Sequence, residues 1–389
     1  MAKIDEIQAE LRNREIPAWL FYDHHHRDAI SYRILGLSKS LMVSRRWFYL
    51  IPAQGEPVKL VHRIEPYHLD TLPGRKELYA RWQELVGRLR ELLSSLPAVA
   101  MQFSPNNMIF TVSTADAGTV DLIRSLGVDV ISSANLVARF EAALTAEQIL
   151  SHFTAGRSID ALMTAVFPEI GRRVRSGGTN EFEIQQWLVE GFGREGLLAD
   201  APPIVAVNQN SSDPHYVPTA DHSARIREGD FVLLDVWAKK NTPDAIYYDI
   251  SWSGFVGCSV PDRVREIFDV VLRSRNAGIE KVTKAIASRN KLCGWEVDKA
   301  ARDVLETEGY ANYLNNRVGH SIGTEVHGNG ANMDDFESHD EREVLPNTCF
   351  SIEPGIYLPE FGLRSEVNML VRPGSAEVTG RVQNDVVLI

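Results

Sequence analysis

The chain has 389 residues, of which 44% are hydrophobic and 24% are charged. This composition is typical of an ordinary globular protein, and the length is enough for about two domains. Lysine and arginine number 41 against 52 aspartate and glutamate residues, which gives a formal net charge of −11. The negative excess argues against nucleic acid or an anionic membrane as the main partner, whereas clustered carboxylates are a common way to hold divalent cations.

Targeting and redox signals predict a cytoplasmic protein. The first residues, MAKIDEIQAELRNREIP, are charged and lack the apolar core of a secretory signal. No apolar run approaches the roughly 18 residues of a membrane span. The three cysteines, Cys258, Cys293 and Cys349, are widely spaced. We expect them to be reduced and buried, without a disulfide framework.

The first part of the chain alternates helix and strand patterns. Apolar residues recur at helical spacing in residues 5–15, 76–95 and 116–126. Short apolar runs predict strands at residues 18–22, 47–52, 59–62, 98–103 and 128–132. This alternation predicts an α/β domain over residues 1–145 with a parallel or mixed sheet.

The second part of the chain begins with a helix and then mixes strands with helices. Thr145 and Gln148 fit a capping box at the start of a long helix that ends near Arg175. Strands are predicted at residues 204–207, 231–237, 246–252, 349–357 and 366–371, and helices at 264–286 and 296–308. This order favours an α+β domain over residues 146–389.

Four carboxylates follow or end apolar runs in this second part. Asp235 ends FVLLD, and Asp249 follows AIYY on the next predicted strand. We expect an antiparallel ladder to set these two aspartates opposite each other, with Cβ atoms about 5 Å apart. Glu353 in FSIEPGIY and Glu366 in GLRSEVNMLV repeat the arrangement. Like charges this close need a positive partner, which neither strand pair contains.

A histidine between glycines completes the cluster. His320 lies in GHSIGTEVHGNG, where little side-chain bulk shields the imidazole from a ligand. Four carboxylates and one neutral histidine carry a charge of −4, which two divalent cations balance. The pattern therefore predicts a two-metal site whose cations share a bridging hydroxide. Each of the five residues, taken alone, is also compatible with a turn, a cap or a structural ion pair.

The ordered motifs NSSDPHY, GDFVLLD, YYDIS, GHSIG, SIEPGIY and GLRSE resemble those of the pita-bread metallopeptidases. That family includes methionine aminopeptidase, Xaa-Pro aminopeptidase and prolidase. The segment YDHHHRDAISYRILG resembles the N-terminal domain of the prolidase, Xaa-Pro aminopeptidase and creatinase branch. The resemblance covers essentially the whole chain, and it implies a pita-bread catalytic domain preceded by a smaller α/β domain of the creatinase/prolidase type.

The resemblance implies a metal-binding role for five residues. Asp235 would chelate one metal, while Asp249 and Glu366 would bridge both. His320 and Glu353 would hold the second metal.

The resemblance also implies four catalytic residues. Glu353 would accept the proton of the bridging water, and His215 and His327 would steady the scissile carbonyl. Arg364 would position the substrate or a neighbouring carboxylate.

The activity implied by the resemblance is hydrolysis of the peptide bond between an N-terminal residue and proline, by an Xaa-Pro aminopeptidase or an Xaa-Pro dipeptidase. Manganese is the metal implied, with cobalt, zinc and iron as further options, and the expected assembly is a homodimer. A non-peptide small-amide hydrolase or lyase on the same metal-binding fold is the alternative. A catalytically silent binding module is a third reading, against which the intact ligand set argues.

Several positions depart from the family pattern and leave the substrate open. The connection between the two aspartates is longer than usual, Trp252 stands where an arginine is frequent, and Asn316 stands where a histidine is frequent. Gly328 replaces a frequent acidic residue. We expect residues 334–343, DDFESHDERE, to form an acidic surface loop at the mouth of the site.

Overall fold

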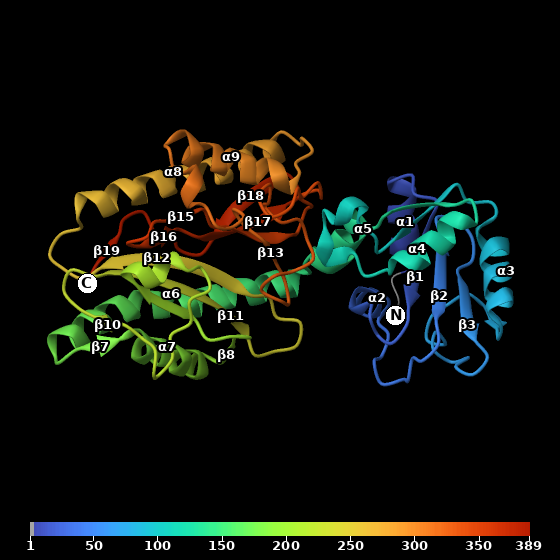
Figure 1. Ribbon diagram of the computed structural model, residues 1–389, viewed down its shortest axis with the longest axis horizontal. Coiled ribbons are helices and arrows are strands. Elements are labelled where there is room, and N and C mark those ends of the chain that lie inside the picture. Colours follow the sequence, from blue (N-terminus) through green and yellow to red (C-terminus); the bar gives the residue numbers. More distant parts are fainter. Residues whose placement is uncertain (1–3) are drawn as a thin grey trace. The chain divides into compact units, whose positions relative to one another are not determined.

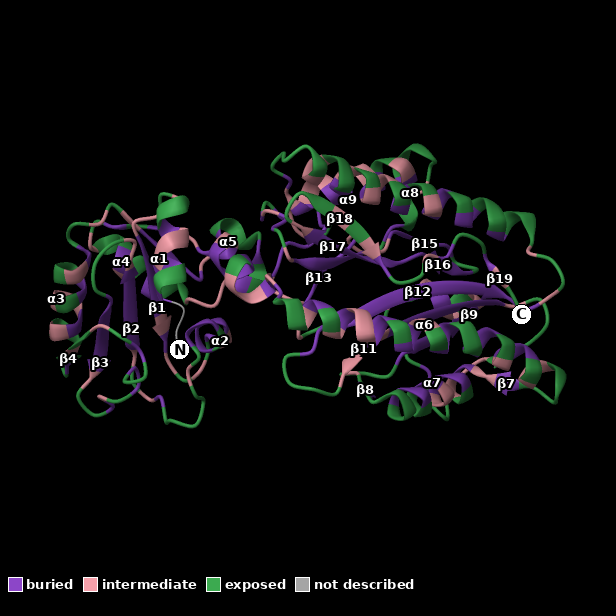
Figure 2. Cartoon of the chain, turned by 180° about the vertical axis from the view of Figure 1, so that it is seen from behind, coloured by how far each residue is buried: buried purple, intermediate pink, exposed green. Residues whose placement is uncertain are grey.

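The computed structural model describes residues 4–389, and the chain divides into one unit that ends at Glu141 and a second unit from Ala142 to Ile389. The boundary predicted from the sequence, between residues 145 and 146, lies slightly further along. In both units most strands are buried, and exposed residues lie on the outer faces of helices and in loops (Figure 2). Within residues 4–389, no helix combines the length and apolar character that a membrane crossing requires.

The first unit is built on one mixed sheet of six strands in the order β4-β3-β2-β1-β5-β6 (Figure 1). The strands are β1 (Ala18–Asp23), β2 (Trp47–Pro52), β3 (Val58–His62), β4 (Arg75–Tyr79), β5 (Ala98–Met101) and β6 (Asp129–Ser132). The helices are α1 (Ile4–Asn13), α2 (Ala29–Leu35), α3 (Trp82–Leu93), α4 (Ala117–Ser125) and α5 (Ala134–Val137). Three short helical turns remain. Two are 3-10 turns, at Pro105–Asn107 and Phe110–Val112, and one is a π-helical turn at Ala138–Ala142.

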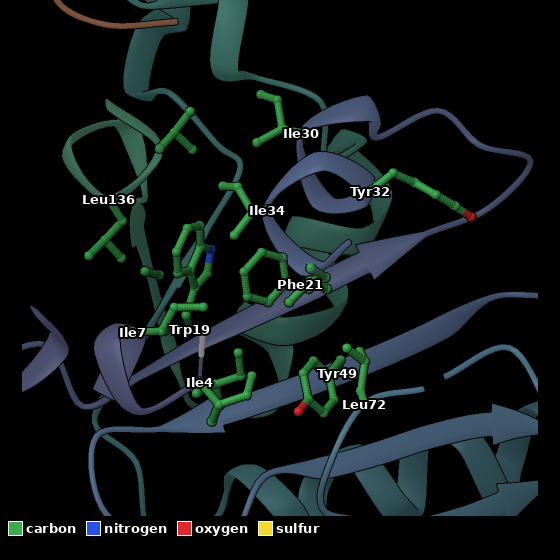
Figure 3. Packing of buried hydrophobic residues seen from close by; sticks show 14 of the residues in the cluster. Ile4, Ile7, Trp19, Phe21, Ile30, Tyr32, Ile34, Tyr49, Leu72 and Leu136 are labelled. Carbon is green, nitrogen blue, oxygen red and sulfur yellow. The ribbon is translucent and has the colours of Figure 1, made fainter. Parts of the chain in front are cut away.

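Alternation along β1 gives the first unit a core on each face of its sheet. Trp19 and Phe21 point to one face, where their rings stack at 4.3 Å. Figure 3 shows them packed among isoleucine and leucine side chains, with Ile7 and Leu136 beside Trp19. Leu20 points to the other face, against the apolar side of α3 and α4. Successive side chains of a strand point to opposite faces, so one buried strand serves two cores.

The second unit contains two main sheets between pairs of helices. Its longer elements are α6 (Ala146–Arg175), α7 (Glu181–Glu195), β9 (Ile204–Val207), β11 (Phe231–Lys240), β12 (Tyr248–Phe255), α8 (Asp262–Ala287), α9 (Gly294–Thr307), β14 (Cys349–Ile352), β17 (Val367–Arg372) and β18 (Ser375–Thr379). Its short elements are β7 (Thr179–Asn180), β8 (Leu197–Leu198), η4 (Asn208–Ser212), β10 (Arg225–Ile226), η5 (Ala311–Tyr313), β13 (Ser321–Ile322), β15 (Gly355–Tyr357), β16 (Gly362–Arg364) and β19 (Val387–Leu388).

The sheets of the second unit form a central layer. One sheet has the order β19-β12-β11-β8 with β9 also paired to β11, and the other has the order β13-β14-β17-β18. Helices α6 and α7 cover this layer on one side, and α8 and α9 cover it on the other (Figure 1). Met163 and Phe167 of α6 pack against Leu234 and Ile250 of the first sheet, which buries the apolar stripe of the helix. The predicted α+β class is confirmed.

Two local predictions are wrong. The helix predicted over residues 76–95 is an edge strand, β4, followed by α3. Most of β4 is exposed and its sequence RKELY is polar, so it carries no strand signal of its own; pairing with β3 makes it a strand. The cysteines are free, but only Cys349 is buried, and Cys258 is exposed.

A buried histidine gives the second unit a defined sensitivity to acid. His152 on α6 is 0% exposed and its Nδ1 donates to the carbonyl oxygen of Tyr247 at 2.6 Å. Its Nε2 accepts from the Thr379 hydroxyl at 2.8 Å, so the neutral ring is fully used. Burial lowers the pKa of His152 from 6.5 to about 4, against a smaller opposing effect of the Tyr247 carbonyl.

Because the folded pKa of His152 is depressed, its contribution to stability is complete above pH 6.5 and is lost as the pH falls toward 4. We expect the free energy of unfolding to drop by roughly 2 kcal/mol from this group between pH 7 and pH 5. Urea unfolding of the wild type and of His152→Gln, which keeps one donor and one acceptor without titrating, measures this. Equal pH slopes in the two proteins would contradict the assignment.

Candidate metal centre

Two neighbouring strands carry the first pair of carboxylates. Asp235 lies on β11 and Asp249 on β12, and they are 8% and 5% exposed. The antiparallel register sets Asp235 opposite Ser251 and Asp249 opposite Trp237. The prediction of directly opposed aspartates is therefore wrong: they are diagonal neighbours on one face of the sheet. The cause is the long connection, because residues 241–247 form a loop and β12 begins only after it.

The second pair of carboxylates lies at the ends of β14 and β17. The antiparallel register of these strands, continued by one position, sets Glu353 opposite Glu366. Asn368 on β17 donates its side-chain amide to the carbonyl oxygen of Asp249 at 2.6 Å and accepts from the Asp249 N–H at 3.2 Å. These hydrogen bonds tie the two strand pairs together at the level of the carboxylates.

His320, just before β13, brings its imidazole to the carboxylates. Its Nε2 lies 3.2 Å from an oxygen of Glu353 and 3.6 Å from an oxygen of Asp249. Gly319 permits this approach, since a Cβ there would stand 2.0 Å from the carbonyl oxygen of Ser351. Burial lowers the pKa of His320, which favours the neutral ring that binds metals. Ligand atoms of Asp249, His320 and Glu366 lie within 4.8 Å of one another.

Two buried carboxylate oxygens have no donor. Among the residues that the structure describes, Asp249 Oδ1 and Glu366 Oε1 make no hydrogen bond. Burial and then the charge of the neighbouring carboxylates raise the pKa of both groups well above their ordinary values. Such an arrangement costs free energy unless cations compensate it. The donor set, oxygen-rich with one imidazole, therefore fits the divalent metal ions that the sequence implies.

Arg364, at the end of β16, neutralises one member of the cluster. Its guanidinium donates to Asp235 at 2.5 Å, to Ser251 Oγ at 2.9 Å and to the Tyr357 hydroxyl at 3.3 Å. Burial disfavours its charge, but Asp235 above all outweighs this and raises the pKa of Arg364 well above its ordinary value. The Ser251 hydroxyl lies 2.8 Å from oxygens of both Asp235 and Glu366. With a single hydrogen, it donates to only one of them at a time.

The two histidines predicted to face the substrate lie at the pocket wall. His215 is exposed in the loop after η4, where its N–H donates to Asp213 at 2.9 Å. The ring of His327 is nearly perpendicular to that of His320, with centroids 4.4 Å apart. His327 is exposed as a whole, but partial loss of water around the ring, and then the charges of His320 and Arg317, lower its pKa.

One pocket of about 380 Å³ gathers all the residues that the sequence singled out for the site. These residues are Asp235, Asp249, His320, Glu353, Glu366, His215, His327 and Arg364. Their roles as ligands and catalysts stay predictions. The whole pocket belongs to the second unit.

The pocket also contains Asp200, Trp237 and Arg317, which sequence reasoning missed as site residues. Asp200 accepts a hydrogen bond from the Trp237 ring at 2.8 Å, a pairing made only by the tertiary fold. Arg317 had a visible signal, because it stands two positions before the GHSIG motif in NNRVGHSIG.

The expectation for the acidic segment of residues 334–343 changes with the structure. Asp334 and Asp340 are fully buried, so residues 334–343 are not simply an acidic surface loop. Asp334 accepts the N–H groups of Phe336, Glu337 and Ser338 and so shapes the loop from inside. Within this segment Glu337 lines the pocket, which agrees with the expectation that the segment lies at the mouth of the site.

Trp252 points away from the pocket. It packs among the apolar side chains beneath α6, with its ring 6.5 Å from that of Phe167. Its substitution for a frequent arginine therefore does not shape the substrate cavity directly.

Comparison with known proteins finds relatives that are named as peptidases, among them a putative Xaa-Pro aminopeptidase from Mycoplasma pneumoniae that is 28% identical over 229 residues, 58% of this chain and 60% of its own length. Curated proteins named Xaa-Pro dipeptidase, from Pyrococcus furiosus and Pyrococcus horikoshii, are 28% and 30% identical over 193 and 196 residues. The matches cover 49% and 50% of this chain, and the chain spans half the length of each relative.

Solved structures share the fold over the full chain. Dipeptidase PepE from Mycobacterium ulcerans has a TM-score of 0.69 at 22% identity, covering 99% of this chain and 96% of its own. A prolidase from Thermococcus sibiricus has a TM-score of 0.63 at 19% identity, covering 100% and 98%. The predicted pita-bread fold with a preceding domain is confirmed. A model of one family, described as "Metallopeptidase family M24", matches residues 152–373, which is more than half of the chain. The resemblance found in the sequence is thus confirmed, and the chain belongs to metallopeptidase family M24.

Proposed function

We propose that the protein is a metal-dependent peptidase that removes an N-terminal residue preceding proline from short peptides. The observation that carries the proposal is the convergence of four carboxylates and one histidine in a single pocket, with two buried oxygens that lack a donor. Family membership and relatives named Xaa-Pro dipeptidase support it.

Five residues would hold two divalent cations: Asp235, Asp249, His320, Glu353 and Glu366. When bound, the cations would acidify water and polarise the scissile carbonyl. We propose manganese as the metal, with cobalt, zinc and iron as alternatives, because carboxylate-rich ligation with one imidazole suits these ions.

Side chains of the pocket would accept the proton of the attacking water and stabilise the negative charge that develops on the carbonyl oxygen. Glu353 faces the pocket with 12% of its side chain exposed, and it would accept the proton of the attacking water. His215 and His327 would donate hydrogen bonds to the carbonyl oxygen as negative charge develops. Arg364 would hold Asp235 in position through the 2.5 Å hydrogen bond.

Preference for proline would rest on shape. An Xaa-Pro bond is a tertiary amide without an N–H, so no hydrogen bond from that nitrogen can select it. Ile204, Trp237 and Val326 line the same pocket and provide apolar surface for the ring. The proposal includes a homodimer, which the sequence resemblance supports and light scattering tests. It also includes a cytoplasmic location, with which the three free cysteines agree.

The direct test is hydrolysis of Ala-Pro, Ala-Pro-Ala and Ala-Ala-Ala by metal-stripped protein with and without added Mn²⁺, followed by mass spectrometry. We expect metal-dependent cleavage of a peptide with proline in second position and none of Ala-Ala-Ala. Silence on all three with metal bound would overturn the peptidase proposal. It would favour a non-peptide amide substrate instead.

A further inference from the structure

Arg317 presents an unused guanidinium to the pocket. Its side chain is only 15% exposed and lines the cavity that holds the candidate metal ligands. Its ion pair within residues 4–389 is with Glu337, at 3.7 Å from Nη1 to Oε2. That distance is beyond a hydrogen bond, and the Glu337 side chain is 42% exposed. A pair of this kind contributes little to stability.

The second guanidinium of the pocket differs in this respect. Each of the three nitrogens of Arg364 donates a hydrogen bond, to Ser251, Tyr357 and Asp235, which holds its guanidinium in place within the cluster. Arg317 carries five N–H donors, none of which makes a hydrogen bond in the described part of the chain. A covered cation without acceptors gains free energy from an anion that binds in its place in the pocket.

The backbone around Arg317 is held from both sides. Arg302 and Asp298 on α9 form a buried ion pair at 2.7 Å. Arg302 donates to the carbonyl oxygen of Asn316 at 3.3 Å, and Asp298 accepts the Val318 N–H at 2.9 Å. The base of the Arg317 side chain is therefore fixed before a ligand arrives, which lowers the entropy cost of binding.

Charge and size indicate what the anion is. The cluster of Asp235, Asp249, Glu353 and Glu366 would face the two cations, whereas the Arg317 guanidinium has only the loose pair with Glu337. The volume of about 380 Å³ lies near the lower end of small-molecule sites, which run from about 300 to 1,000 Å³. A planar guanidinium matches a carboxylate in a bidentate arrangement.

We propose that Arg317 binds the free C-terminal carboxylate of the substrate, so that the substrate class is the dipeptide. This inference rests on the proposed peptidase function and deepens it. Glu337 holds the guanidinium loosely in the absence of substrate and yields to the substrate carboxylate. A longer peptide or an amidated dipeptide offers no carboxylate at this position and is a poor substrate.

The kinetic test compares Ala-Pro with its C-terminal amide in the Mn²⁺-loaded protein. We expect kcat/KM to favour the free acid by roughly 10- to 100-fold, the size of a charge-assisted bidentate contact. Arg317→Gln should bring the two values to within about threefold, whereas Arg317→Lys keeps the charge and retains part of the preference. Glu337→Gln should preserve the preference for the acid. Equal rates for acid and amide in the wild type, or equal losses for both in Arg317→Gln, would overturn the proposal.

A binding test separates Arg317 from the peptidase proposal. The ligand is Ala-Pro with a CH₂ group in place of the scissile carbonyl, as the free acid and as the amide, titrated calorimetrically. Tighter binding of the acid by the wild type, lost in Arg317→Gln, supports carboxylate recognition even if no peptide is hydrolysed. Equal affinity for acid and amide overturns it even in an active peptidase. Urea unfolding of each variant confirms that it is folded.

Discussion

Asp249→Asn is expected to abolish hydrolysis while it makes the metal-free protein more stable. Asp249 is 5% exposed, one of its oxygens has no hydrogen-bond partner, and its pKa is raised well above 3.8 by burial and then by Asp235 and Glu353. The amide removes a charge that only metal ions can compensate. Activity should fall by about 1,000-fold or more, because a bridging ligand of the metal pair is lost.

The gain in stability of metal-free Asp249→Asn over metal-free wild type should increase as the pH rises. A carboxyl group whose folded pKa is raised contributes its full stability at low pH, where it is protonated, and loses it as the pH rises above the unfolded value near 3.8. Metal-free wild type should therefore be less stable than Asp249→Asn at pH 7, by on the order of 1–4 kcal/mol. The difference should shrink toward pH 4.

Urea unfolding of metal-stripped proteins at pH 5 and pH 7 measures this effect. Asp303→Asn is a matched control, because Asp303 is an exposed aspartate on α9 paired with Lys299. Added Mn²⁺ should stabilise the wild type and the control but not Asp249→Asn. An Asp249→Asn protein that keeps full activity, or that is less stable than metal-free wild type at pH 7, would contradict the assignment.

Arg364→Met is expected to give the largest loss of stability. Arg364 is 3% exposed and its guanidinium donates to Asp235 at 2.5 Å. Its removal leaves Asp235 buried beside three other carboxylates without a cationic partner, which costs about 3–5 kcal/mol. The loss should be smaller in the metal-loaded protein, since the cations then compensate Asp235.

The measurement is the urea midpoint of the wild type and Arg364→Met, each with and without Mn²⁺. Arg364→Lys keeps the charge but not the fork that reaches Asp235, Ser251 and Tyr357, and it should fall between the two. Equal losses with and without metal would mean that Arg364 acts through packing alone.

The sequence was sufficient to predict the identity of the clustered residues because each has a local signal. Asp235 and Asp249 interrupt or follow apolar runs, and His320 lies between glycines. The structure brings them together with Glu353 and Glu366 in one pocket. Period-two and helical spacing likewise predicted most strands and helices of both units, because burial of one face dictates these periods.

Features that depend on long-range pairing were not predictable. The register of β11 and β12 depends on the loop at residues 241–247, whose unusual length is visible in the sequence, but the alternation of apolar residues does not give the diagonal placement of the aspartates. The edge strand β4 is polar and takes its conformation from β3. The contact of Asp200 with Trp237 and the buried aspartates of residues 334–343 arise from tertiary packing.

We propose that five residues of one pocket hold two metal ions. The most direct test of this proposal is the metal content of the wild type, Asp249→Asn and Glu366→Gln after reconstitution with Mn²⁺ and gel filtration, measured by inductively coupled plasma mass spectrometry. We expect two ions per chain in the wild type and loss of metal in both variants, each of which removes a carboxylate proposed to bridge the ions. A wild type that retains no metal, or variants that retain as much as the wild type, would contradict it.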